Sequence, residues 1–471
     1  MRKRPARIRR KTSSPRKLAL EVLCACPPAR LRRRTHPGAQ ASKDAHHVSA
    51  ARAAEEAGER SVTEVLSEAL NTSGLSRLDE ALATELVYST LRRRLTLDWL
   101  IEKFSGVGTR RIEQSLLNIL RLGVLQLLYM ESVPDYAAVD ESVRLARARL
   151  GARAAGFANS VLRKVAASAS SIPFPSMEKD AVGYLSIVHS HPKWMVRRWV
   201  ERFGEEAAES VCVANNTPPP LTARVNVLKT SRESLIQRLA EEGVEAAPRE
   251  EEQAIEIVKC PMVISELPSF REGLFYLQDV SAMIPAKMLS PAEGEKVLDL
   301  CSAPGGKATH LAELMGNRGL VVACDVDEAK MALLRENVER LGAKIVRSLL
   351  ADGTRIDAVL RPEFDRVLVD APCSNTGVLR RRVEARWRLR EKDIKQLQQM
   401  QVSLLRSACV VLRRGGALVY STCSIEAEEN QEVIKEFLAQ RVNFELVEER
   451  AFLPRLRRGG DGGYAAKLVK R

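Results

Sequence analysis

The sequence lacks several features that would assign it to particular protein classes. No uninterrupted apolar stretch approaches the roughly 20 residues that a membrane-spanning helix requires, so we expect a soluble protein with no membrane partner. The nine cysteines form no C-x-x-C pair, and the closest two, Cys24 and Cys26, have no His or Cys partner at metal-site spacing. This argues against a disulfide framework and a metal site, and it favours a reducing, cytoplasmic environment.

Acidic residues are almost absent from the beginning of the chain. Residues 1–40 hold thirteen Lys or Arg and one acid, Glu21, which accounts for +12 of the formal net charge of +14. Such arms usually bind nucleic acid through its phosphates, and the alternative is a solvated tail without a specific partner. Large apolar residues are almost absent from residues 27–59, which we interpret as a disordered insertion.

The hydrophobic pattern divides the 471 residues into helical, mixed and alternating parts. The alternation of strands and helices after about Gly273 predicts a parallel sheet built from βαβ units. We expect five strands, at residues 296–300, 319–325, 344–350, 366–370 and 417–422. The predicted organisation is a basic arm (1–14), a helical domain (15–165), a linker (166–176), a small α+β module (177–285) and an α/β domain (286–471).

Residues 297–310 indicate a strand, a glycine-rich turn and the start of a helix. The turn lacks the G-x-G-x-x-G pattern, so a dinucleotide is not expected, but Gly305 and Gly306 permit close backbone approach to a ligand. Asp325 ends the next strand, nineteen residues after Gly306, where an acid can accept hydrogen bonds from ribose hydroxyls. Asp352 follows the third strand and could meet an adenine amino group. Each acid could instead be a helix N-cap, but together they favour S-adenosylmethionine as the cofactor.

Two cysteines, Cys373 and Cys423, each follow a short apolar run that indicates a buried strand. In an open α/β sheet the carboxyl ends of the strands form the crevice where ligands bind. Paired thiols at that edge suggest covalent catalysis. The residues alone do not rank the two thiols, and either could be a buried packing residue.

Three motifs carry a resemblance to a known family. They are Asp-Leu-Cys-Ser-Ala-Pro-Gly-Gly-Lys at 299–307, Asp-Ala-Pro-Cys-Ser-Asn-Thr-Gly at 370–377 and Tyr-Ser-Thr-Cys-Ser-Ile-Glu-Ala-Glu-Glu-Asn at 420–430. They closely resemble the motifs of the RNA 5-methylcytosine methyltransferases. The helical part, with Phe-Ala-Asn-Ser-Val-Leu-Arg at 157–163, is similar to a NusB-type RNA-binding domain. The resemblance implies an all-α NusB-like domain, a small α+β RNA-binding linker module and a Rossmann-like methyltransferase domain, in a monomer that acts on small-subunit ribosomal RNA.

The resemblance also implies roles for individual residues. Carbon five of cytosine is too weak a nucleophile to take a methyl group unaided, so a thiolate must first add at carbon six. By resemblance Cys423 is that nucleophile, and Cys373 assists product release. Asp370 would contact the cytosine and lie near the cofactor, while Lys307 would position the base. The cofactor-binding residues implied are Cys301, Ser302, Ala303, Pro304, Gly305, Gly306, Lys307, Asp325, Asp352 and Asp370.

The sequence departs from the family pattern at a few positions. Asn375 stands where the family usually has Gly, which puts the conformation of that loop in doubt, as do Val383 and Glu384 in place of Pro-Asp. Gly463 replaces a usual aromatic residue, so we expect a looser last strand.

A run of arginines follows the Pro-Cys loop and surrounds Trp387. It predicts phosphate binding and base stacking, and the alternative is a solvated helix face. The arginines are Arg380, Arg381, Arg382, Arg386, Arg388 and Arg390.

Two other function classes compete with this interpretation. A DNA cytosine-5 methyltransferase also uses a thiolate, but takes it from the Pro-Cys loop, and the intact Ser-Thr-Cys-Ser motif speaks against it. A non-catalytic NusB-type RNA-binding factor would not need both cysteines and the cofactor acids.

Overall fold

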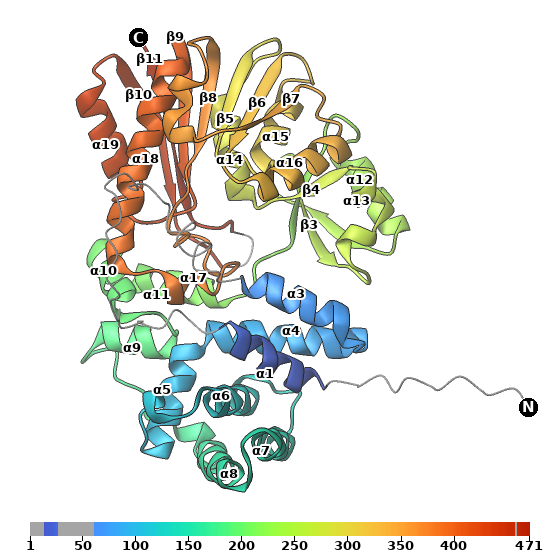
Figure 1. The fold of residues 1–471 in the computed structure, drawn as a ribbon, viewed down its shortest axis with the longest axis vertical. Helices are drawn as coiled ribbons and strands as arrows, with labels where there is room; N and C mark the ends of the chain where they lie inside the picture. The colour runs from blue at the N-terminus through green and yellow to red at the C-terminus, as the bar shows by residue number, and fades with distance from the viewer. Residues whose placement is uncertain (1–13, 27–60, 457–458) are drawn as a thin grey trace, which may run out of the picture. The chain divides into compact units, whose positions relative to one another are not determined.

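The computed structural model describes residues 14–26, 61–456 and 459–471 (Figure 1). These residues form two compact units. The first contains residues 14–26, 61–216 and 386–388, and the second contains 217–385, 389–456 and 459–471. The predicted insertion, and the predicted basic arm apart from Ser14, lie outside the described residues. Within the described part, no helix is long and apolar enough to cross a membrane.

The first unit is helical, as the sequence predicts. The side chain of Ser14 accepts a hydrogen bond from the backbone N–H of Lys17 at the start of α1, and Ser61 and Glu64 form a capping box at the start of α3. Its helices are α1 (Pro15–Ala25), α3 (Val62–Ser73), α4 (Arg77–Arg92), α5 (Arg94–Ser105), α6 (Gln114–Tyr129), α7 (Asp135–Leu150), α8 (Ala152–Ala167), α9 (Ala181–Val188), α10 (Lys193–Phe203), α11 (Glu205–Asn216) and most of the short α17 (Ala385–Arg388).

The first unit continues beyond residues 166–176, which the sequence predicts to be a linker. Phe174, inside that segment, stacks on Trp99 of α5 with ring centroids 5.3 Å apart. The hydroxyl of Thr96 donates a 2.6 Å hydrogen bond to the carbonyl of Ile187 in α9. These long-range contacts join residues 181–216 to the first unit, whereas the sequence placed them with the small α+β module. The division falls after Asn216.

The second unit begins with a four-stranded antiparallel sheet in the order β2-β3-β1-β4. Its strands are β1 (Thr222–Val225), β2 (Glu245–Pro248), β3 (Ala254–Lys259) and β4 (Phe275–Leu277), with helices α12 (Arg232–Glu241) and α13 (Pro268–Arg271). Leu235 and Leu239 of α12 share a buried cluster with Ile255 and Phe275. An α+β module is therefore present, but it begins at β1.

A seven-stranded sheet dominates the second unit, in the order β10-β11-β9-β8-β5-β6-β7 (Figure 1). Five strands are parallel, and they agree with the five predicted strands to within a few residues. They are β5 (Lys296–Leu300), β6 (Leu320–Asp325), β7 (Val346–Leu350), β8 (Phe364–Asp370) and β9 (Leu412–Thr422). Two further strands, β10 (Phe444–Phe452) and β11 (Gly463–Lys470), are antiparallel to their neighbours. β11 is the last strand expected at Gly463, whereas β10 was not predicted.

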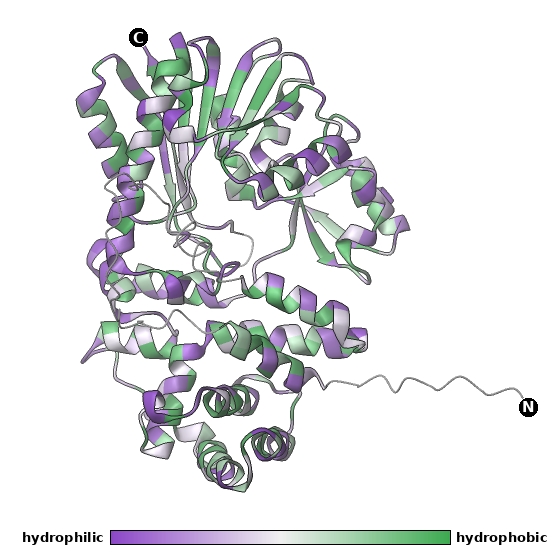
Figure 2. Ribbon diagram, viewed as in Figure 1, coloured by the Kyte–Doolittle hydropathy of each residue, from purple (hydrophilic) through white to green (hydrophobic). Residues whose placement is uncertain are grey.

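Helices cover both faces of this sheet. Neighbouring residues of β5 point to opposite sides: Val297 packs in a cluster with α14, α15 and α16, while Leu298 packs in a cluster with α18 and α19. Burial on both faces explains the apolar colouring of the central strands in Figure 2. The covering helices are α14 (Val280–Leu289), α15 (Gly306–Leu314), α16 (Glu328–Leu341), α18 (Glu391–Val411) and α19 (Gln431–Gln440).

Gly463, which stands in place of an aromatic residue, does not interrupt the last strand. Gly463 opens β11, pairs with Phe452 of β10, and is followed by a regular ladder to β9. A Cβ atom at Gly463 would lie 3.0 Å from the Phe452 ring, so this ring already occupies the space beside the glycine.

A buried ion pair joins the small sheet to the large one. The guanidinium group of Arg224 in β1 binds Glu313 in α15 through two hydrogen bonds. Its Nε and Nη2 donate to the two carboxylate oxygens, at 2.9 and 2.8 Å. Both side chains are at most 1% exposed. Arg224 Nη1 also donates to the carbonyl of Gly306, the first residue of α15, at 2.6 Å. The pair therefore supports the glycine-rich turn from behind.

Removing one partner of this pair should destabilise the protein strongly. Arg224→Ala leaves the Glu313 carboxylate buried without its cation, which typically costs about 3–5 kcal/mol. We expect a correspondingly lower free energy of unfolding in urea. Arg318→Ala, which removes an exposed ion pair with Glu293, is the matched control and should leave the transition unchanged. An Arg224→Ala protein with the wild-type midpoint would contradict this account.

Candidate active site

The candidate residues share one edge of the large sheet because β5, β6, β7, β8 and β9 run parallel. Cys301 and the glycine-rich turn follow β5, Asp325 ends β6, and Asp370 ends β8. Asp352 lies two residues beyond β7, and Cys423 directly follows β9. The structure thus brings the sequence-predicted residues to the carboxyl edge of adjacent strands.

The two cysteines meet at this edge. Their Sγ atoms are 3.1 Å apart, and both cysteines are free thiols. β8 and β9 are neighbours with Asp370 opposite Ser421, so the loops that follow these strands start side by side. The structural condition for a shared catalytic pocket is therefore met for Cys373 and Cys423.

Hydrogen bonds fasten the two cysteine loops to each other. The backbone N–H of Gly377 donates to the carbonyl of Cys423 at 2.9 Å, and the N–H of Ile425 donates to the hydroxyl of Thr376 at 3.0 Å. A Cβ atom at Gly377 would lie 2.4 Å from the carbonyl oxygen of Gly462, so only glycine allows this approach. These contacts hold the backbones of the two loops side by side.

Asn375 resolves the doubt about the Pro-Cys loop. Its φ is +61°, a left-handed conformation that glycine adopts freely and that asparagine tolerates better than most residues. Its side-chain amide donates to the carbonyl of Cys373 at 2.9 Å, and its Oδ1 accepts a 3.3 Å contact from the Cys423 thiol. Asparagine therefore preserves the turn and adds a polar contact with each cysteine, which the sequence analysis did not anticipate.

Lys307 and Asp370 form an ion pair beside the thiols. Lys307 Nζ lies 2.5 Å from Asp370 Oδ2, and the hydroxyl of Ser421 donates to Asp370 Oδ1 at 2.9 Å. Burial alone would lower the pKa of Lys307, but attraction to Asp370, and to Asp299 and Cys423, raises it above the ordinary value. The lysine is thus a fixed cation whose field includes Cys423.

The glycine-rich turn has the shape expected of a ligand cradle. Gly305 has a φ of +98° and precedes α15, whose first N–H groups have no partner within the helix. A Cβ atom at Gly306 would lie 2.9 Å from the Tyr276 ring, so the backbone approaches that ring as only glycine can. Cys301, at the start of the turn, also has a positive φ, of +59°. Asp325 Oδ2 accepts a 3.1 Å hydrogen bond from the N–H of Ala303, which binds the turn to the end of β6.

Asp352 has the geometry of the N-cap alternative. Its Oδ1 accepts hydrogen bonds from the backbone N–H of Thr354 at 2.9 Å and from the Thr354 hydroxyl at 2.7 Å. The residue is exposed at the carboxyl edge of the sheet. Capping and a role toward a ligand are compatible in this position.

The arginine run differs from the prediction. Arg380 is 2% exposed and bonds to Asp461 at 2.5 Å, and Arg381 contacts both Asp461 and Asp279. Arg386 is fully buried, so the prediction that these two arginines, Arg380 and Arg386, face RNA is wrong.

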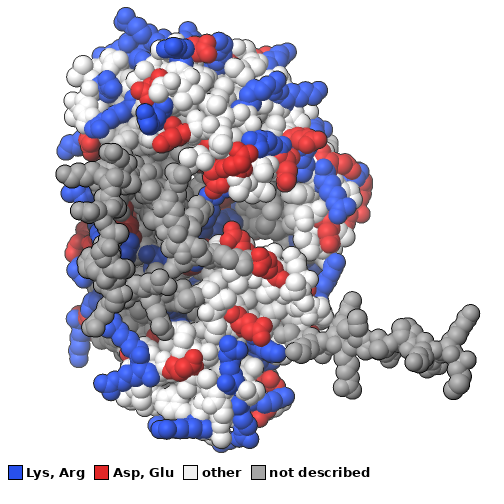
Figure 3. Space-filling model, viewed as in Figure 1, with Lys and Arg blue, Asp and Glu red and all other residues white. Residues whose placement is uncertain are grey.

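Arg386 donates hydrogen bonds to the backbone carbonyls of Arg92, Ser190 and Asn215 within the first unit. Burial lowers its pKa to about 9. The indole N–H of Trp387 is also engaged, with the carbonyl of Leu91 at 2.8 Å. Arg382 and Arg390 of the run are exposed. In Figure 3, Lys and Arg side chains lie among Asp and Glu side chains where the described residues are in view.

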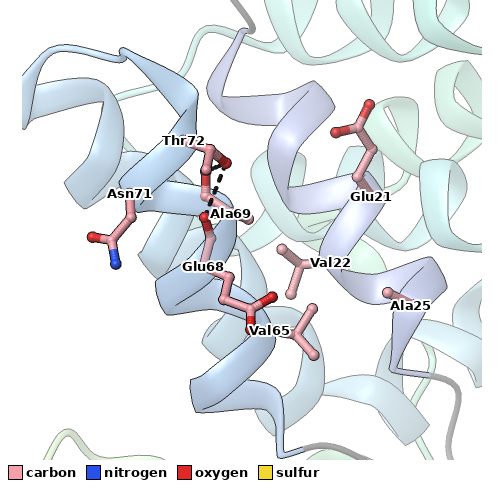
Figure 4. Close-up of a pocket in the computed structure, with 8 residues that line it drawn as sticks. All are labelled: Glu21, Val22, Ala25, Val65, Glu68, Ala69, Asn71 and Thr72. Carbon is pink, nitrogen blue, oxygen red and sulfur yellow. Dashed lines mark hydrogen bonds between the residues drawn. The ribbon is translucent and has the colours of Figure 1, made fainter.

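A separate pocket lies between α1 and α3 in the first unit (Figure 4). Val22, Ala25, Val65 and Ala69 make its wall apolar, and the hydroxyl of Thr72 is bonded to the backbone of Glu68. The lining contains no Cys, His or Lys, so it offers no chemistry of the kind found at the sheet edge. Among the described residues, no group of three or more His, Cys, Asp or Glu side chains is placed to hold a metal ion.

Three family models match the chain in sequence order. The NusB family matches residues 43–167, the RsmF/B-like ferredoxin-like domain matches 191–263, and the 16S rRNA methyltransferase RsmB/F model matches 286–464. The third match contains every candidate residue at the sheet edge.

Relatives and solved structures agree with these matches. The probable ribosomal RNA small subunit methyltransferase B of Bacillus subtilis is 37% identical over 81% of this chain and 85% of its own length. The crystal structure of PH0851 is similar with a TM-score of 0.73 and 30% identity, over 87% of this chain and 94% of that one. The structure of NSun6 from Pyrococcus horikoshii with SFG has a TM-score of 0.55 and 25% identity, over 60% of this chain and 99% of that one.

The sequence analysis missed Asp299, a fully buried acid behind the glycine-rich turn. Its Oδ2 accepts a 2.7 Å hydrogen bond from Ser302, while its buried Oδ1 has no partner in the described structure. Burial raises its pKa to about 7, although the Ser302 hydroxyl opposes that shift and Asp370 adds to it. An acid inside an otherwise apolar strand was the sequence signal that could have identified Asp299 as a site residue.

The pKa of Asp299 predicts a pH-dependent stability. Because the folded-state value lies above the ordinary value of 3.8, the stabilisation of the protonated acid is complete below about pH 4 and is lost as the pH rises to about 7. Asp299→Asn should not show this loss. The free energy of unfolding of the variant, minus that of the wild type, should therefore be larger at pH 8 than at pH 4 by on the order of 2–4 kcal/mol. Urea titrations across this range measure the difference.

Asp327→Asn is the control, because hydrogen bonding to Lys330 lowers the pKa of Asp327 and its carboxylate is already ionised in this range. Its effect should be the same at pH 5 and pH 8. An Asp299→Asn curve parallel to that of the wild type would refute the assignment.

Proposed function

The chain belongs to the RsmB/F family of 16S rRNA methyltransferases, and we propose that it methylates carbon five of a cytosine in small-subunit ribosomal RNA. It is an S-adenosylmethionine-dependent RNA methyltransferase of the type named ribosomal RNA small subunit methyltransferase B. The single observation that carries the chemical part of the proposal is the 3.1 Å separation of two free thiols at the catalytic edge of the sheet. A cytoplasmic monomer is part of the same proposal.

The surroundings of the two thiols support Cys423 as the nucleophile. The hydrogen bond with Cys423, and then burial, raise the pKa of the Cys373 thiol well above its ordinary value. Cys373 therefore keeps its proton, while Cys423 lies in the field of the Lys307 ammonium group. This asymmetry agrees with the roles that the family resemblance implies.

The proposed reaction uses the thiols in turn. The Cys423 thiolate adds to carbon six of the cytosine, which makes carbon five an enamine carbon that can accept the methyl group. After methyl transfer, the proton on carbon five passes to water, and the electrons of that bond re-form the double bond between carbons five and six. The bond between carbon six and sulfur then breaks, which releases the Cys423 thiolate. Cys373 is the protonated neighbour that assists this release. In our proposal Asp370, held by Lys307 and Ser421, contacts the cytosine.

The residues that follow β5, β6 and β7 at the carboxyl edge of the sheet fit S-adenosylmethionine, which supplies the methyl group when bound. The backbone of Cys301, Ser302, Ala303, Pro304, Gly305 and Gly306 would hold it, with the carboxylates of Asp325 and Asp352 toward its ribose and adenine. The left-handed backbone of Gly305, directly before α15, and the exposed carboxylate of Asp352 suit this use. Support also comes from the similarity to NSun6 solved with SFG, an analogue of the same cofactor.

Substitution of the cysteines tests the chemistry. Cys423→Ala should lower methyl transfer to small-subunit RNA by roughly 10³-fold or more, because no nucleophile remains. Cys373→Ala should instead accumulate a covalent protein–RNA adduct, visible as a slow band on a denaturing gel. Cys409→Ala, a buried cysteine of α18 outside the site, is the matched control and should retain activity. The reverse pattern, with Cys373 essential and Cys423 dispensable, would assign the nucleophile as in DNA cytosine-5 methyltransferases.

The substrate is tested in cells. Bisulfite sequencing of ribosomal RNA from cells that lack the gene should show one or more small-subunit cytosines that lose protection. The wild-type gene should restore protection, and the Cys423→Ala gene should not. An unchanged small-subunit pattern would overturn the substrate assignment, and a change confined to DNA would favour the competing class.

A further inference from the structure

Glu429 is a buried carboxylate between the two cysteine loops that the mechanism so far does not use. It is fully buried and lies after β9, just before α19. Its Oε1 accepts from the backbone N–H of Ser374 at 2.8 Å and from Gln401 at 3.0 Å. Its Oε2 accepts from the hydroxyls of Ser374 and of Ser424, the latter at 2.5 Å. Each carboxylate oxygen thus accepts two hydrogen bonds.

These contacts bracket Cys373 on both sides. Ser374, which follows Cys373, gives Glu429 two hydrogen bonds, and Gln401 also donates to the carbonyl of Pro372, which precedes it, at 2.9 Å. Ser424, which follows Cys423, is bound to the same carboxylate. One side chain therefore binds the residues next to both thiols. Glu429 lies 55 positions from Ser374 in the sequence and 5 positions from Ser424.

The four donors to Glu429 are all neutral, so none of them compensates the charge of its carboxylate. The charges around the two thiols are therefore uneven. The cation of the site, Lys307, acts on the Cys423 side, where it pairs with Asp370. The anion of Glu429 acts on the Cys373 side. Donors to both carboxylate oxygens suit the ionised form, although burial raises the pKa of Glu429.

We propose that Glu429 is a positioning residue that holds Cys373 against Cys423 and keeps Cys373 in its thiol form, so that only Cys423 becomes the nucleophile. The proposal rests on the proposed function, because it concerns the division of labour between the same two cysteines. It adds a physical reason for that division. The Glu429 carboxylate, which is bonded to the backbone N–H that follows Cys373, disfavours a second negative charge on Cys373.

The titratable groups around Cys373 are consistent with this role. Its pKa is raised first by the hydrogen bond with Cys423, then by burial, and also by the negative charges of Cys423 and Glu429. The remaining neighbour, Tyr420, donates its hydroxyl to the backbone carbonyl of Glu429 at 2.6 Å, and burial keeps its pKa well above the ordinary value. Tyr420 therefore stays neutral while the thiols titrate.

Thiol alkylation in the absence of RNA tests the charge. In a Cys423→Ser background, which removes the competing thiol, the rate of Cys373 modification by iodoacetamide is measured by peptide mass from pH 6 to 10. Adding Glu429→Gln keeps the shape and removes the charge. We expect about tenfold faster Cys373 alkylation at pH 7.5, the change produced by a fall of about one in its pKa. Adding Glu363→Gln, which neutralises an exposed glutamate of the same unit that pairs with Lys296, should leave the rate unchanged.

A shorter acid tests the positioning. Glu429→Asp keeps the charge but is one methylene too short to reach both loops, so Cys373 alkylation should stay slow while the kcat of methylation falls about tenfold at unchanged KM for RNA. Faster Cys373 alkylation in Glu429→Asp as well as Glu429→Gln would overturn the charge role, and so would an unchanged rate in a folded Glu429→Gln protein. A wild-type kcat in Glu429→Asp would overturn the positioning role, and this variant decides the case if Glu429→Gln does not fold.

Failure of this inference differs from failure of the proposed function. If Cys373 alkylation ignores Glu429 while Cys423→Ala still abolishes methylation, the function stands and the inference falls. If Cys423→Ala remains active while Glu429→Gln accelerates Cys373 alkylation, the electrostatic role stands without the proposed reaction.

Discussion

The parallel pairing of β8 with β9 is the constraint from which the site follows. The register places Asp370 beside Ser421, and each strand is followed within three residues by a cysteine. The sheet therefore brings the two cysteine loops together, and within them the sulfurs lie 3.1 Å apart. β5 lies on the other side of β8 and is followed by the turn that leads to Lys307. Three adjacent strands thus supply two thiols, an acid and a cation to one place.

The sequence was sufficient for features whose signals are local. A parallel strand covered on both faces appears as a short apolar run, and this is why five strands and their polar ends could be located. β10 left no such signal because it is an edge strand with exposed acids such as Glu445 and Glu449. The extent of the helical unit to Asn216 was not predicted, for a related reason. Phe174 reads as part of a polar linker until its stacking partner, Trp99, is known.

Contacts between distant residues were out of reach of pattern analysis. The arginines after the Pro-Cys loop look like a nucleic-acid surface, but Arg380 is neutralised by Asp461, 81 positions away, and Arg381 by Asp279, 102 positions away. Burying a guanidinium group requires such partners, and composition does not reveal them. Glu429 was equally invisible, since it belongs to an acidic run whose members look alike. The left-handed turn at Asn375 could have been suspected from the tolerance of asparagine for that conformation.

The fastening of the two cysteine loops has a consequence for how the enzyme selects RNA. Backbone hydrogen bonds, the glycine contact at Gly377 and the Arg380–Asp461 pair leave the pocket walls little freedom to adapt. The deformation needed to bring cytosine and sulfur together then falls on the nucleic acid, where extruding a base from its stack costs a few kcal/mol. A rigid pocket of this kind discriminates between cytosines by how readily each leaves its helix. Selectivity would thereby depend on the local stability of the RNA helix as well as on its nucleotide sequence.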